Sequence, residues 1–72
     1  MHRKEKHIMG QKMVDIYEAI SKEDGMRGQM RLAMITGITT ASAKNTPDTP
    51  EKLAQFAAAY KKITQKECPI EI

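Results

Sequence analysis

The chain has 72 residues, which is enough for one domain at most, and residues 1–72 are treated as a single small domain. A chain this short buries only about 60% of its unfolded surface, so a core of its own leaves a thin margin of stability. Because Cys68 is the only cysteine, an intramolecular disulfide is excluded, while the net charge of +3 permits a nucleic-acid or acidic partner without requiring one.

No metal site, catalytic site or membrane segment is predicted. His2 and His7 are five residues apart, whereas a metal-binding pair on a helix needs a spacing of three or four. No phosphate-binding glycine loop or catalytic constellation is recognisable, so we expect no enzyme activity and no cofactor. Gly10, Gln11 and Lys12 interrupt any apolar segment after the charged N-terminus, which argues against a signal peptide or membrane span. A single unpaired cysteine is consistent with a reducing cytoplasm.

The first predicted helix covers about residues 3–22. Its apolar residues recur at i, i+4, i+7, i+8 and i+11, which places them in one stripe along a helix. Gly25 is the expected end of this helix, because glycine readily adopts the positive φ that follows a last turn. The stripe consists of Met9, Met13, Ile16, Tyr17 and Ile20.

The second predicted helix covers about residues 26–45 and is apolar on two opposite sides. Leu32 and Ile35 project from nearly the opposite side to the larger apolar face, and a helix that is apolar on both sides is normally surrounded. We therefore expect the first and third helices to cover the larger face and another chain to cover Leu32 and Ile35. The larger face consists of Met26, Met30, Ala33, Met34, Gly37, Ile38 and Ala41.

This pattern leads to the hypothesis that the protein assembles with itself as a homo-oligomer or docks to another protein. Small residues such as Ala33 and Gly37 would let a second helix approach closely. The methionines at i, i+4 and i+8 either fill the core, the interpretation we favour, or form an adaptable binding surface, because thioether chains repack easily. The predicted interface residues are Met26, Met30, Leu32, Ile35 and Gly37.

The same segment also resembles a helix-turn-helix motif broken at Gly37. Motifs of this kind place a small residue four positions before a turn glycine, here Ala33 and Gly37, and Thr39 or Thr40 would cap the second helix. The resemblance implies a small DNA-binding regulator of bacterial or phage type. The side chains that would contact phosphates or base edges are those of Arg27, Arg31, Thr40, Ser42, Lys44 and Asn45.

The segment departs from the helix-turn-helix pattern at three positions. Thr36 stands before the glycine where an apolar residue is typical, and Ala43 is small for the inward side of a recognition helix. The next inward position is Thr46, directly before Pro47, whose ring disfavours helical conformation there. We therefore favour a continuous, close-packed second helix over a turn onto DNA.

The third predicted helix covers about residues 50–66. Thr49 suits the N-cap and Pro50 suits the first helical position, where no N–H is needed. An apolar stripe follows at helical spacing, formed by Leu53, Phe56, Ala57, Tyr60 and Ile63. The sequence therefore predicts an all-α fold, a small three-helix bundle with helices at about 3–22, 26–45 and 50–66, and an oligomeric state.

Overall fold

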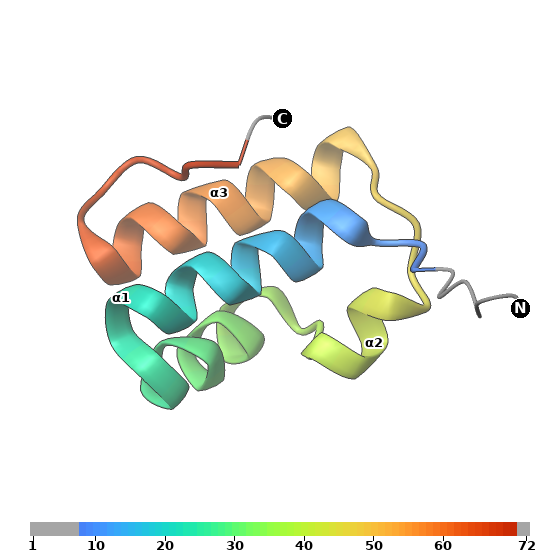
Figure 1. Ribbon diagram of the computed structural model, residues 1–72. Helices are drawn as coiled ribbons and strands as arrows, with labels where there is room; N and C mark the ends of the chain where they lie inside the picture. The colour runs from blue at the N-terminus through green and yellow to red at the C-terminus, as the bar shows by residue number, and fades with distance from the viewer. Residues whose placement is uncertain (1–7, 71–72) are drawn as a thin grey trace, which may run out of the picture.

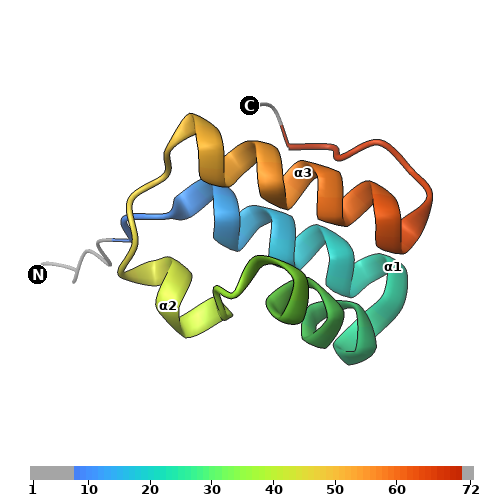
Figure 2. The same cartoon turned by 180° about the vertical axis from the view of Figure 1, so that it is seen from behind.

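The computed structural model describes residues 8–70, and all regular structure in that range is helical. Helix α1 spans Gln11–Thr36, α2 spans Thr40–Lys44 and α3 spans Pro50–Thr64. The first half of α1 lies beside α3, and the second half of α1 folds back beneath it (Figures 1 and 2). Helix α1 thus contacts both other helices, and the predicted all-α class is confirmed.

A sharp kink at Gly25 divides α1 into two helical segments, residues 11–24 and 26–36. The backbone of Gly25 has φ 63° and ψ −149°, a combination that essentially only glycine adopts. The positive φ predicted at Gly25 is confirmed, although the chain passes from one segment into the next without a loop. Ile8, Met9 and Gly10 precede α1 and are not helical, so the predicted start near residue 3 is wrong for these residues. Residues 3–7 lie outside the described part of the chain.

The prediction of one continuous helix over residues 26–45 is wrong, because α1 ends at Thr36. Gly37 follows in the left-handed conformation (φ 76°, ψ 7°), and its N–H donates to the carbonyl oxygen of Ala33 at 2.7 Å. A Cβ added to Gly37 would meet no atom within 4 Å. Glycine is therefore required here by the conformation of the turn, and not by the approach of another helix.

Two side chains from α1 hold the turn that follows Gly37. The Tyr17 hydroxyl donates to the carbonyl oxygen of Ile38. The Thr36 hydroxyl donates to the carbonyl oxygen of Leu32 at 2.8 Å and accepts from the N–H of Ile38 at 3.2 Å. The polar residue before the glycine thus satisfies backbone groups that the end of the helix would otherwise leave unpaired.

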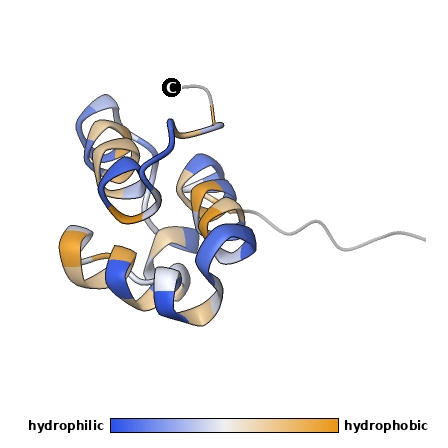
Figure 3. Cartoon of the chain, turned by 90° about the vertical axis from the view of Figure 1, so that its left-hand side faces the viewer, coloured by the Kyte–Doolittle hydropathy of each residue, from blue (hydrophilic) through white to orange (hydrophobic). Residues whose placement is uncertain are grey.

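The hydrophobic core lies between the two segments of α1 and helix α3, which Figure 3 shows packed side by side. The ring of Tyr17 meets the ring of Phe56 edge-on, with 5.7 Å between the ring centres. The predicted stripes of the first and third helices supply most of this core, whereas Met9 is 55% exposed. The buried residues are Met13, Val14, Ile16, Tyr17, Ile20, Leu32, Ala43, Leu53, Phe56, Ala59 and Tyr60.

Asp48, in the connection before α3, caps the N-terminus of α1 from a distant part of the sequence. Its carboxylate accepts from the backbone N–H of Lys12 at 3.1 Å and of Met13 at 3.4 Å. These N–H groups have no partner within the helix, so the carboxylate both satisfies them and complements the positive end of the helix dipole. Helix α3 has the predicted cap, since the Thr49 side chain accepts from the N–H of Lys52 at 3.2 Å. It ends at Thr64, slightly before the predicted residue 66.

Candidate protein interaction surface

The face of the second α1 segment that packs against the core is opposite to the face predicted to do so. Leu32 is fully buried, whereas Met30 is 63% exposed and Met34 is 82% exposed. Residues two positions away on a helix project about 160° away, so burial of Leu32 directs both methionines to solvent. The predictions that Leu32 contacts another chain and that the methionines fill the core are therefore wrong. A branched leucine fills a defined space in a core better than a flexible methionine does.

The exposed side of this segment carries an unbroken row of methionines, which we call the methionine face and define as Met26, Met30 and Met34. Met26 is 72% exposed, so all three side chains project mainly into water. Their spacing of four residues makes the row about 12 Å long along the helix axis. Ile35, at 50% exposure, adds a fourth apolar side chain beside the end of the row. Contiguous exposed apolar side chains are typical of protein interaction sites.

A shallow groove lies on each side of the methionine face. The first, the basic groove, has a volume of about 380 Å³ and is lined by Arg31, Met34, Ile35, Lys62 and Ile63. The second, the apolar groove, has a volume of about 270 Å³ and is lined by Tyr17, Met26, Gln29, Met30, Ala33, Thr39 and Thr40. The methionine face is thus the ridge between two depressions, which is a shape that another helix or chain segment can pack against.

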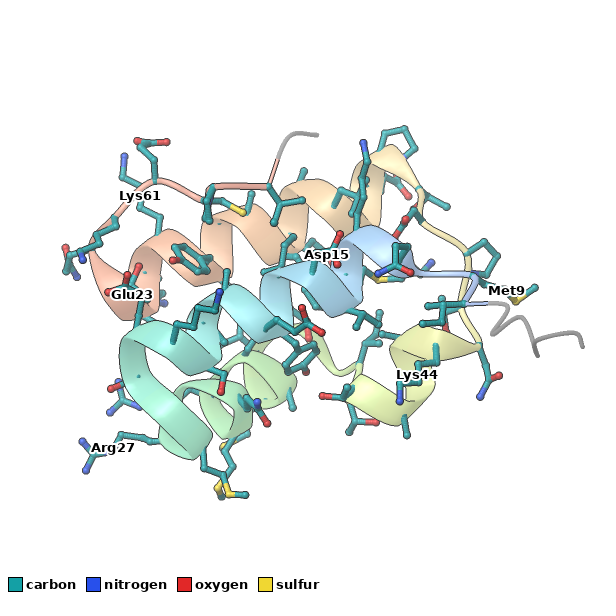
Figure 4. The ribbon with its side chains drawn as sticks, viewed as in Figure 1. Met9, Asp15, Glu23, Arg27, Lys44 and Lys61 are labelled. Carbon is teal, nitrogen blue, oxygen red and sulfur yellow. The ribbon has the colours of Figure 1, made fainter. Side chains whose placement is uncertain are left out.

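The edge of the methionine face next to the basic groove is positively charged. Arg27 and Arg31 are both exposed and lie one turn apart on the outer side of α1, and Lys62 joins them from α3. Figure 4 shows Arg27 projecting into solvent next to the kink. The ion pairs found in residues 8–70 are Lys61 with Glu67 and Lys66 with Glu23, so none of these three cations forms an ion pair there.

The residues predicted to contact DNA do not form one surface. Ser42, Lys44 and Asn45 are exposed on or beside α2, and Thr40 is half-buried at its start. Lys44 and Arg27 lie well apart, Lys44 on α2 and Arg27 next to the kink in α1 (Figure 4). Helix α2 has five residues, so it is only about 7.5 Å long. The break in the helix at Gly37 does match the helix-turn-helix interpretation, although the second helix is short.

Within residues 8–70, the His, Cys, Asp and Glu side chains form no cluster suited to metal binding. No three His, Cys, Asp or Glu side chains in that range lie close enough to hold a metal ion, and His2 and His7 lie outside it. Burial raises the pKa of Tyr17 above its ordinary value of 10.0, an effect that the hydrogen bond with Thr36 partly offsets. Within the described part of the chain, no helix is both long and apolar enough to cross a membrane.

The five residues predicted to form one interface do not lie together. They are Met26, Met30, Leu32, Ile35 and Gly37. Met26, Met30 and Ile35 lie together on the exposed side of α1, Leu32 is in the core, and Gly37 is in the turn. The sequence prediction left Met34, Lys62 and Ile63 out of the interface. Met34 could have been found from its spacing to Met30, whereas the two α3 residues reach this surface only through tertiary packing.

No protein-family model matches this chain, and no curated protein or solved structure matches it significantly.

Proposed function

We propose that this chain is a small, non-catalytic cytoplasmic protein that acts by binding another protein chain, either a second copy of itself or a different protein. The observation that carries the proposal is the methionine face, whose three side chains are 63–82% exposed in one row on a rigid helix. Burying a large apolar side chain against a partner contributes about 1.5–3 kcal/mol. Binding at this surface would therefore be driven by apolar surface that the monomer leaves in water.

The residue type also supports a binding role. Methionine has three rotatable bonds and a polarisable sulfur, so a row of methionines adapts to partners of different shape. The core of this protein already contains better-shaped residues at the inward positions, namely Leu32, Ile16 and Ile20. The methionines are thus not needed to fill the core, and packing of the monomer gives no reason for their position.

The proposal is tested with the double variant Met30→Ser/Met34→Ser and the control variant Met9→Ser. Met9 is also exposed but lies before α1, away from the methionine face. Light scattering would measure self-association, and affinity capture with quantitative mass spectrometry would measure binding to other proteins. We expect the wild type and Met9→Ser to share one association, either with themselves or with a recurrent protein, and the double variant to lose it. At a protein concentration low enough that the wild type is monomeric, the melting temperature of the double variant should equal that of the wild type. A double variant that keeps every association of the wild type would refute the proposal.

A second candidate function, DNA binding, is supported by the break in the helix at Gly37 and by the N-cap at Thr39 that starts α2. Here Lys44, Ser42 and Asn45 would contact the duplex from α2. The affinity for a duplex would then fall steeply as salt rises, and Lys44→Ala would weaken it. A mobility-shift titration at low salt checks this, and a duplex that is not retarded at all would exclude the candidate.

A further inference from the structure

The methionine face is flanked by positively charged side chains that form no ion pair within residues 8–70, and that charge restricts what can cover it. The sequence has no acidic residue between positions 25 and 47, and Arg27, Arg31 and Lys62 form no ion pair within residues 8–70. A partner that buries the methionines must also bring these cations into a less polar environment, which is costly unless it supplies negative charge.

We propose that the partner of this surface is an acidic amphipathic helix of a different protein, with apolar residues that pack on the methionine face and carboxylates along one flank that pair with Arg27, Arg31 and Lys62. This inference rests on the proposed function and names the class of partner. The length of the row, about 12 Å, matches apolar residues at i, i+4 and i+7 or i+8 of a partner helix. The carboxylate flank lies over the basic groove, and the apolar side of the partner covers Met26 and Met30.

A second copy of this chain fits the surface less well. In a twofold contact with antiparallel helices, Arg27 and Arg31 of both copies would come to one seam. With parallel helices they would face the uncharged flank of the other copy, which carries Gln29 and Ala33. Residues 25–47 offer no acidic side chain to pair with these cations, and Glu23, just before the kink, already pairs with Lys66. Cations that meet like charges or no charge at an interface oppose binding, which favours a different protein as the partner.

An anionic membrane surface also fits less well than an acidic helix. Membrane-binding helices present a broad apolar face to the lipid, with their basic residues above it. Here the row is short and stands between two grooves of about 380 and 270 Å³, which a flat bilayer would leave unfilled. A helix can enter such grooves with its side chains, because ridges of one helix pack between those of another.

The experiment uses the full chain as bait for a phage-displayed library of amphipathic helices with leucine fixed at the seam and both flanks randomised. We expect recovered helices to carry Asp or Glu on one flank. A labelled recovered peptide is then titrated by fluorescence anisotropy against the wild type, Arg31→Glu and the control Lys44→Glu. The two variants change the charge equally, but Lys44 lies on α2 and lines neither of the grooves beside the methionine face. Arg31→Glu should weaken binding by about tenfold or more, and Lys44→Glu by no more than about twofold.

Several results would overturn the acidic-helix proposal. These are neutral or basic flanks in the recovered helices, no recovered helix at all, equal losses for Arg31→Glu and Lys44→Glu, or wild-type binding to phosphatidylserine vesicles in place of peptide. If helices with neutral flanks are recovered and Met30→Ser abolishes their binding, the acidic class is refuted while the proposed docking function stands. If Met30→Ser/Met34→Ser alters no association, both proposals fail together. Circular dichroism melting of each variant confirms that it is folded.

Discussion

The orientation of the second α1 segment can be tested by comparing the stability lost on truncating buried Leu32 with that lost on truncating exposed Met34. Leu32 is fully buried, so Leu32→Ala removes apolar contacts and leaves a cavity, which costs about 2–5 kcal/mol. At roughly 0.05–0.15 kcal/mol per residue, the whole 72-residue domain has only about 4–11 kcal/mol of stability. A loss of about 3 kcal/mol corresponds to a fall of about 12–24 °C in melting temperature for a domain of this size.

Met34→Ala is the matched control, because Met34 is 82% exposed two positions along the same helix. Truncating a side chain that makes few contacts changes stability by no more than about 0.5 kcal/mol. Thermal and urea unfolding, followed by circular dichroism at low protein concentration, would measure both variants. If Leu32→Ala melts with the wild type, or if Met34→Ala loses as much stability as Leu32→Ala, the orientation of this helix and the methionine face are both refuted.

Further predictions concern the turn, the caps and the buried tyrosine. Gly37→Ala should lower the free energy of urea unfolding by about 1–2 kcal/mol, because alanine resists positive φ. Gly37→Asn should lower it less, because asparagine tolerates positive φ better. Equal stability of the wild type and both variants would contradict the left-handed conformation of Gly37. Asp48→Ala should lose about 1 kcal/mol, close to the loss for Thr49→Ala, because both side chains accept from helix N-terminal N–H groups. A neutral Asp48→Ala would mean that α1 has no cap from this residue. Burial raises the pKa of Tyr17, so the folded state holds its proton more tightly than the unfolded state does. The resulting contribution to the free energy of unfolding is complete below the unfolded pKa of 10.0 and is lost as the pH rises through the folded pKa. Between about pH 8 and about pH 11, the free energy of unfolding should therefore fall less for Tyr17→Phe than for the wild type. An equal fall in both proteins would show that Tyr17 is not the group responsible.

Local features of the sequence predicted the outer helices well. The spacing of Met13, Ile16 and Ile20 indicated one buried stripe, and Thr49 with Pro50 located the start of α3. Both signals act within about two turns of one helix, so they do not depend on the rest of the fold. The positive φ at Gly25 was predicted for the same reason.

The middle of the chain was predicted less well because its pattern is ambiguous. A helix with apolar residues on two sides does not specify which side is buried, and Leu32 and the methionines were assigned the wrong way round. Gly37 is compatible with close helix packing and with a left-handed cap, and only the conformation of the turn distinguishes the two. Its stabilising contacts, from Tyr17 to Ile38 and from Thr36 to Leu32, include one that spans 21 residues.

By itself, the sequence determined the all-helical class, the buried stripes of the two outer helices and the start of α3. It also determined that the middle segment has more apolar surface than one short helix can bury. The tertiary structure decided which apolar side of this segment is buried and which stays exposed, because that choice depends on the helices packed beside it. It also brought Lys62 and Ile63 of α3 beside Arg31 and Met34, which no local spacing could have indicated. The candidate site therefore consists of a methionine row that is readable in the sequence and a basic border that only folding assembles.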